Sequence, residues 1–151
     1  MKIIIGSDHA GYELKGKIKE YLAGLGISCD DVGPDKFDPS DDYPDFIATA
    51  AREVARNPGS RGIVIGGSGQ GEAIAANKIR GIRASVYYGG PLDIVRLSRM
   101  HNDANVLSLG ARFLGRDEAM RAVKVWLETP FSGEERHKRR ILKIGKLEKT
   151  G

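Results

Sequence analysis

The central part of the chain reads Ile63-Val64-Ile65-Gly66-Gly67-Ser68-Gly69-Gln70-Gly71-Glu72 and continues as Ala73-Ile74-Ala75-Ala76-Asn77-Lys78. Its apolar start predicts a buried strand, its glycines a tight loop, and its alanine-rich end a helix. A glycine loop between a strand and a helix directs backbone N–H groups toward the helix N-terminus, where an anion can bind. Glu72 adds a carboxylate beside this anion site. Such a pair suits chemistry in which a proton leaves carbon while negative charge develops on a neighbouring oxygen.

Two other interpretations of the loop stay open at this point. The glycines could serve only to let a strand and a helix pack closely. Glu72 could be a carboxylate that interacts with the helix dipole, which would lower its pKa, so it would need burial to act as a base. The loop is not a Walker P-loop, because Glu72 stands where that motif has lysine, and it lacks the G-x-G-x-x-G spacing of dinucleotide sites.

Apolar strand patterns alternate with helical patterns along the chain. The predicted strands are residues 2–6, 27–32, 61–66, 82–87 and 104–108, and the predicted helices are 11–25, 43–57, 70–79, 91–101, 116–128 and about 133–148. This alternation predicts a parallel sheet covered on both faces. We therefore expect one domain, residues 1–151, with a three-layer, doubly wound, Rossmann-like α/β fold. Its five-stranded sheet would have the order 2-1-3-4-5, and an extra helix would follow at the C-terminus.

Composition narrows the possible partners. No apolar run approaches the roughly 20 residues of a membrane helix, so we expect no membrane partner. The one cysteine, Cys29, cannot form an internal disulfide and fits a reducing cytoplasm. The formal net charge of +4 comes from residues 132–151, which hold seven Lys or Arg and three Glu. This basic segment could face nucleic acid, a phosphorylated small molecule or solvent.

Polar residues follow the strands whose carboxyl ends should form the crevice of such a sheet. The first strand ends in Gly6-Ser7-Asp8-His9-Ala10-Gly11, and the third ends in the glycine loop. Asp8 could instead cap the following helix, with His9 playing no part. Residues 33–42 form the longest loop, either a mobile lid or a simple connection.

His101 precedes the fifth strand, in the segment His101-Asn102-Asp103-Ala104-Asn105. A residue that enters a parallel strand lies at the amino end of the sheet, opposite the crevice. If His101 acts at the glycine loop, it therefore acts at the loop of a neighbouring subunit. The alternative is a histidine that only interacts with the negative end of a helix.

The C-terminal helix should begin with a capping box in Ser132-Gly133-Glu134-Glu135. Arg136 and Arg140 then lie one turn apart on one face, a spacing that could clamp a phosphate dianion, with Arg112 as a third candidate. A solvated basic face is the alternative for Arg136 and Arg140.

Taken together, these segments resemble the family of type B ribose-5-phosphate isomerases and galactose-6-phosphate isomerases. The resemblance runs from Met1 to about Leu147. It is carried by residues 6–11, 42–45, 66–78, 99–107, 110–112 and 136–140.

The resemblance implies roles for individual residues. Asp8 and His9 would contact the sugar and its phosphate, and His101 would open the sugar ring with Asn102 binding beside it. The loop Gly67, Ser68, Gly69, Gln70 and Gly71 would form the anion hole, and Arg112, Arg136 and Arg140 would hold the phosphate. Many members have a cysteine base at the position of Gly66, whereas others have a glutamate at that of Glu72. We therefore assign the base to Glu72.

The implied activity is interconversion of ribose 5-phosphate and ribulose 5-phosphate through a cis-enediolate, with Glu72, His101, Asp8 and Ser68 as catalytic residues and Tyr43 as a possible pocket residue. No metal or cofactor is expected. The family implies a homodimer with shared active sites, and a further association of two dimers into a tetramer stays open. Three alternatives stay open: isomerisation of allose 6-phosphate or galactose 6-phosphate, a non-catalytic phosphosugar-binding subunit, and a nucleic-acid-binding module. The last lacks any recognisable RNA-binding or zinc-finger signature, so no nucleic acid is expected.

Overall fold

A computed structural model of the chain describes residues 1–149, so the last two residues of the expected domain lie outside the described part. The strands are β1 (Lys2–Ser7), β2 (Ser28–Asp31), β3 (Arg61–Gly66), β4 (Ala84–Tyr87) and β5 (Val106–Gly110). The helices are α1 (Tyr12–Gly24), α2 (Tyr43–Arg56), α3 (Gln70–Asn77), α4 (Asp93–Met100), α5 (Arg116–Glu128) and α6 (Glu135–Leu147). All eleven predicted elements are confirmed, with ends that shift by a few residues.

The strands form one parallel sheet, which confirms the doubly wound α/β class. The predicted strand order 2-1-3-4-5 is wrong in its second half, because the order is β2-β1-β3-β5-β4. Burial gives the physical reason. Every residue of β5 is buried, as an interior strand requires, whereas three of the four residues of β4 are only half-buried. The strand with less apolar surface to cover takes the edge.

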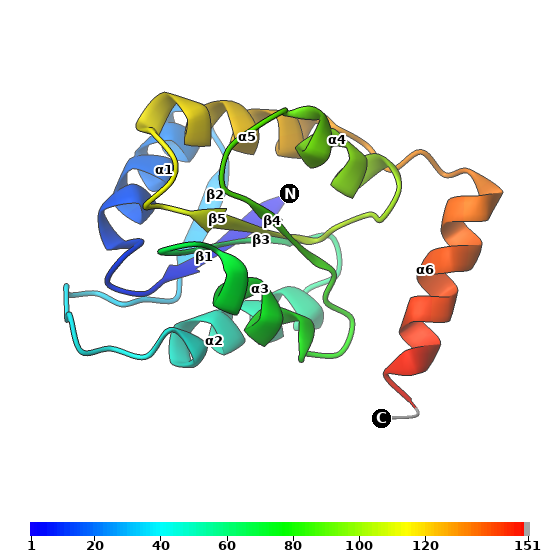
Figure 1. Cartoon of the computed structure of the whole chain (residues 1–151), viewed down its shortest axis with the longest axis horizontal. Coiled ribbons are helices and arrows are strands. Elements are labelled where there is room, and N and C mark those ends of the chain that lie inside the picture. The colour runs from blue at the N-terminus through cyan, green and yellow to red at the C-terminus, as the bar shows by residue number, and fades with distance from the viewer. Residues whose placement is uncertain (150–151) are drawn as a thin grey trace.

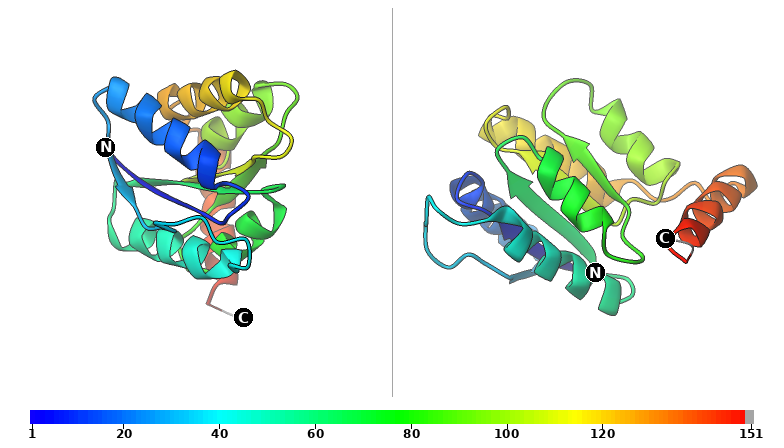
Figure 2. Two further views of the ribbon diagram at one scale, coloured as in Figure 1. Left: turned by 90° about the vertical axis from the view of Figure 1, so that its left-hand side faces the viewer. Right: turned by 60° about the horizontal axis from the view of Figure 1, so that its bottom comes forward.

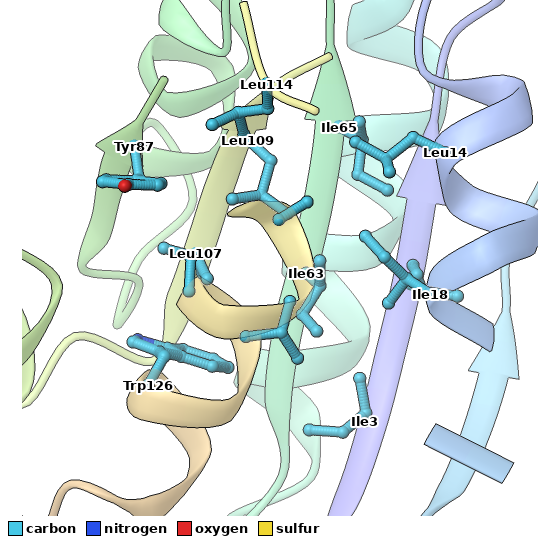
Figure 3. Packing of buried hydrophobic residues seen from close by; sticks show 14 of the residues in the cluster. Ile3, Leu14, Ile18, Ile63, Ile65, Tyr87, Leu107, Leu109, Leu114 and Trp126 are labelled. Carbon is cyan, nitrogen blue, oxygen red and sulfur yellow. The ribbon is translucent and has the colours of Figure 1, made fainter. Parts of the chain in front are cut away.

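Two helical layers cover the sheet (Figure 1). Helices α1, α4 and α5 lie over one face and α2 and α3 over the other, as the side view also shows (Figure 2). The larger core lies under α1 and α5, where Ile63, Leu107 and the fully buried Trp126 pack together (Figure 3). This packing fixes the strand ends from which the functional loops emerge.

Helix α6 projects from the body of the molecule (Figures 1 and 2). His137 is its only buried residue, while Leu142 is 66% exposed and Ile144 43% exposed. The predicted capping box is wrong, since the N-cap is Glu134 and makes no side-chain cap. The Ser132 hydroxyl accepts a hydrogen bond from the Glu134 N–H at 3.2 Å and contacts His137 Nδ1 at 2.7 Å, so His137 engages the group that was expected to cap the helix.

Across residues 1–149, none of the helices combines the length and apolar character that crossing a membrane requires.

Candidate active site

The glycine loop connects β3 to α3 as the sequence predicts. Gly69 is the N-cap of α3 and has φ of +79°, a left-handed conformation that glycine adopts without strain. Its carbonyl accepts a hydrogen bond from the Ser108 hydroxyl of β5 at 2.7 Å, and the Ser68 hydroxyl accepts one from the Gln70 N–H at 3.2 Å. The loop is therefore held in place against the neighbouring strand and by its own side chain.

A cavity of about 540 Å³ opens beside this loop. Its lining residues are Asp8, His9, Ala10, Tyr43, Gly67, Ser68, Gly71, Glu72, Arg112 and Phe113. They come from the carboxyl ends of β1, β3 and β5 and from the starts of α2 and α3. The structure thus brings together the candidates of the first strand end, the glycine loop and Arg112, at the edge of the sheet where the topology places a crevice.

Glu72 lines this cavity but is itself only 4% exposed. Burial raises the pKa of its carboxyl, and the nearby charge of Asp8 acts in the same direction. Its Oε2 atom is buried and makes no hydrogen bond within residues 1–149. The burial that a base at this helix N-terminus needs is therefore present, and a dipole-stabilised surface carboxylate does not describe Glu72.

Glycine at position 66 is required by this arrangement. A Cβ atom at Gly66 would lie 1.7 Å from Glu72 Oε1, far inside any allowed contact. A Cβ at Gly71 would likewise lie 2.5 Å from the Tyr43 hydroxyl, so Tyr43 packs directly on the loop. Cys29, in contrast, lies on β2, and burial raises the pKa of its thiol to about 11, so its thiol is inert as a base at neutral pH.

Asp8 lines the cavity and also bonds the turn that precedes α1. Its Oδ1 accepts a hydrogen bond from the N–H of Gly11, the N-cap residue of α1, at 3.1 Å. Its own N–H donates to the carbonyl of Ile65 at 3.3 Å, which joins the first strand end to the third. Helix α1 has no side-chain cap at its N-cap Gly11, so Asp8 holds the turn before the helix and lines the cavity at the same time.

Arg112 lies over the glycine loop. Its N–H donates to the Gly67 carbonyl at 3.0 Å, and a Cβ at Gly67 would lie 3.1 Å from its guanidinium. Among the described residues Arg112 has no acidic partner within ion-pair distance. A positive charge without a counter-ion beside an anion-binding loop suits a phosphate group.

The remaining candidates lie elsewhere. His101 follows α4 and precedes β5, at the amino end of the sheet, where its ring stacks on His137 with centroids 4.2 Å apart. Asn102 lines a second cavity of about 470 Å³ beside α6. Arg136 is exposed and pairs with Glu134 at 2.7 Å, and Arg140 is also exposed. One chain alone therefore does not place His101, Asn102, Arg136 or Arg140 at its own glycine loop.

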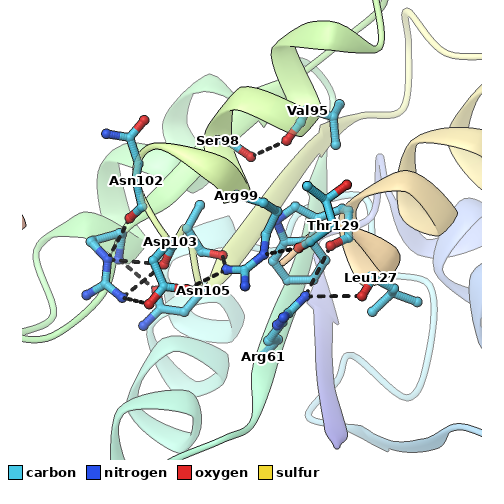
Figure 4. Close-up of polar contacts among 12 residues, drawn as sticks. Arg61, Val95, Ser98, Arg99, Asn102, Asp103, Asn105, Leu127 and Thr129 are labelled. Carbon is cyan, nitrogen blue, oxygen red and sulfur yellow. Dashed lines mark hydrogen bonds and ion pairs between the residues drawn. The ribbon is translucent and has the colours of Figure 1, made fainter. Parts of the chain in front are cut away.

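The buried Arg99 fixes the segment that carries His101 (Figure 4). Arg99 donates from Nη1 to Asp103 Oδ1 at 2.8 Å and to the Ala104 carbonyl at 2.7 Å, and from Nε to the Thr129 carbonyl at 3.1 Å. Asp103 has φ of +45°, a strained conformation that these bonds hold. The amino-end segment is thus rigid rather than a loose helix end.

Sequence reasoning missed Asp41. Its Oδ1 lies 2.7 Å from His9 Nδ1, and Asp8, His9 and Asp41 place one ligand atom each within 4.8 Å of one another. This is the only such group of potential metal ligands found among residues 1–149. Asp41 lies in a loop without periodicity and is 32 residues from His9 along the chain, so no local sequence pattern predicts their contact.

Residues 3–144 match the family model described as Ribose/Galactose Isomerase. The chain belongs to this family. It is 43% identical over 150 residues to ribose-5-phosphate isomerase B of Mycobacterium leprae, an alignment that covers 99% of this chain and 91% of that protein. The family assignment establishes it as a sugar-phosphate isomerase.

Solved structures of other family members agree. Ribose-5-phosphate isomerase B of Clostridium thermocellum superposes with a TM-score of 0.94 at 47% identity, covering 99% of both chains. The Mycoplasma genitalium ribose-5-phosphate isomerase B, solved with bound ribulose 5-phosphate, gives a TM-score of 0.94 at 40% identity, covering 99% of this chain and 97% of that one. The α/β architecture described above is therefore that of the family.

Proposed function

We propose that this isomerase interconverts ribose 5-phosphate and ribulose 5-phosphate by metal-independent proton transfer through a cis-enediolate. The observation that carries the proposal is the buried Glu72, with its raised pKa, in a cavity that also holds the glycine loop and Arg112. The names of the relatives support the five-carbon substrate.

The mechanism assigns each group one task. His101 and Asp8 open the furanose ring by moving a proton between the ring oxygen and the C1 hydroxyl. Glu72 removes the proton from C2 of the aldose and returns it at C1. The amides of the glycine loop and the Ser68 hydroxyl stabilise the oxyanion that develops, a contact often worth about 3 kcal/mol per donor. Arg112, Arg136 and Arg140 bind the phosphate.

A homodimer completes the site in this proposal. Apolar side chains on α4 and α6 are left exposed, among them Leu97 at 45%, Met100 at 38% and Leu142 at 66%. A second copy that covered them could bring its His101, Asn102, Arg136 and Arg140 to the glycine loop of the first. The placement of these residues at the amino end of the sheet supports an active site that is shared between subunits. We propose the cytoplasm as the place where the enzyme works.

The first test is isomerisation of ribose 5-phosphate by the EDTA-treated protein, measured directly as ribulose 5-phosphate, with allose 6-phosphate and galactose 6-phosphate in parallel. We expect turnover of ribose 5-phosphate to be fastest. A preference for a six-carbon substrate would contradict the pentose assignment. Activity that disappears with EDTA and returns with a divalent cation would contradict metal independence and implicate the Asp8, His9 and Asp41 group.

The base is tested by Glu72→Gln. This variant should lose turnover by at least about 100-fold, the usual scale of a lost general base, yet still bind the sugar phosphate. Near-normal turnover would show that another group removes the proton. Sugar phosphate binding without turnover by the unaltered protein would favour a binding subunit that needs a partner.

A further inference from the structure

The imidazole of His9 is held by a single carboxylate oxygen. Asp41 Oδ1 lies 2.7 Å from His9 Nδ1 and also accepts a hydrogen bond from the His9 backbone N–H at 3.1 Å. The Asp41 side chain is 7% exposed, whereas that of His9 is 27% exposed and lines the cavity. Asp41 is thus more buried than the ring that it contacts, and it is not among the residues that line the cavity.

The loop that carries Asp41 is tied to α1 rather than free. Lys15 Nζ donates to the Pro34 carbonyl at 2.7 Å, and the Tyr12 hydroxyl donates to the Asp35 carbonyl at 3.1 Å. The Phe37 ring meets the His9 ring edge-on, with centroids 6.2 Å apart. These contacts anchor the start of the loop on α1 and place the Phe37 ring against His9.

We propose that Asp41 is a positioning residue that fixes the tautomer and orientation of His9, so that His9 Nε2 faces the sugar phosphate. The proposal rests on the proposed function. With Nδ1–H donated to Asp41, Nε2 of the neutral ring carries the lone pair and accepts a hydrogen bond from a sugar hydroxyl. Within residues 1–149, Nε2 makes no hydrogen bond, so it is available to a ligand.

A purely structural role explains the carboxylate less well. Asp41 Oδ2 is buried and has no hydrogen-bond partner among the described residues, which costs stability. Closing the loop needs no charge, since the Asp41 N–H already donates to the Asp38 carbonyl at 3.1 Å. The contact with His9 Nδ1 explains why a carboxylate, which accepts a hydrogen bond from the ring, stands at position 41.

The ring itself provides the first test, without substrate. Long-range ¹H–¹⁵N spectra of protein labelled at histidine report which ring nitrogen carries the proton, and His9→Gln assigns the His9 signals. We expect neutral His9 to carry its proton on Nδ1 in the unaltered protein and in Asp41→Asn, whose amide oxygen can still accept. Asp41→Ala should lose this preference. A proton on Nε2 in the unaltered protein, or no change in Asp41→Ala, would overturn the proposal.

Kinetics provide the second test. We expect Asp41→Ala to raise KM on the order of tenfold with kcat within about twofold, and Asp41→Asn to recover most of the loss. Asp38→Asn is the matched control, because Asp38 lies in the same loop and its side chain bonds only Ser40. It should leave KM unchanged.

A double variant separates positioning from folding of the loop. Added to His9→Gln, Asp41→Ala should cause no further rise in KM, since it acts only through the missing ring. A full additional rise would show that Asp41 acts on the loop instead. If the unaltered protein turns over no sugar phosphate, the proposed function fails, whereas the spectra still decide the Asp41–His9 relationship.

Discussion

The carboxylate of Glu72 occupies the space that a side chain at position 66 would fill. A Cβ at Gly66 would meet Glu72 Oε1 at 1.7 Å and Cδ at 2.0 Å. Positions 66 and 72 lie on opposite ends of the glycine loop, yet they share one volume at the cavity wall. Only one of them can carry a functional group there, which agrees with the expectation, drawn from the family resemblance, that the base stands at one position or the other.

Gly66→Ala should therefore lower turnover strongly, although it replaces no catalytic residue. The added methyl must push the Glu72 carboxylate away, so we expect kcat to fall by about 100-fold or more, as for a lost base. The strand should still form, and the circular dichroism spectrum should match that of the unaltered protein. Gly16→Ala is the control, because Gly16 lies in α1 with nothing within 4 Å of an added Cβ. An active Gly66→Ala would mean that Glu72 can move and still serve as the base.

Removing the Glu72 charge should stabilise the fold in a pH-dependent way. Burial raises the pKa of this carboxyl in the folded state, so the unfolded state ionises first as the pH rises. The folded protein therefore loses stability as the pH rises from the ordinary glutamate pKa through the raised one. Glu72→Gln should melt at a higher temperature than the unaltered protein at pH 8, and the gap should narrow at pH 4. A difference in melting temperature that widens at pH 4 would contradict the raised pKa of Glu72.

The two arginines of α6 should contribute binding rather than chemistry. Arg136→Ala and Arg140→Ala should each raise KM by about tenfold or more with a smaller change in kcat, since a phosphate is held equally in the ground and transition states. Lys138→Ala is the matched control, because Lys138 is an exposed cation between the two arginines and lies on the opposite side of the helix. Steady-state kinetics across a range of substrate concentrations separate the two constants. An unchanged KM in both variants would reject the phosphate clamp.

Mixed dimers should reveal whether the active site is shared. Glu72→Gln and His101→Asn should each be inactive alone, but a heterodimer of the two contains one site with both groups intact. Random reassociation should then restore about a quarter of the activity.

The control mixture combines Glu72→Gln with Asp8→Asn. Both residues line the same cavity of one chain, so neither site of that heterodimer is intact and no activity should return. Recovery in the control, or none in the test mixture, would contradict sharing.

Local patterns in the sequence predicted the elements well, because strand and helix periodicities and glycine loops are properties of short segments. The order of β4 and β5 could not be read this way, since right-handed crossovers allow either order and the choice depends on how fully each strand is buried. The cap of α6 was mispredicted because Ser132 bonds to His137, a contact that a four-residue motif does not contain. The sequence did not indicate Asp41 for the same reason, since Asp41 contacts His9, which lies 32 residues away along the chain.

The exposed helix α6 bears on how the protein holds its shape. A helix of 13 residues that buries almost none of its own surface is only marginally stable in water. If a second chain covers its apolar side chains, association supplies the free energy that keeps the helix formed. The melting temperature would then rise with protein concentration, and the smallest unit with a defined stability would be the pair of chains.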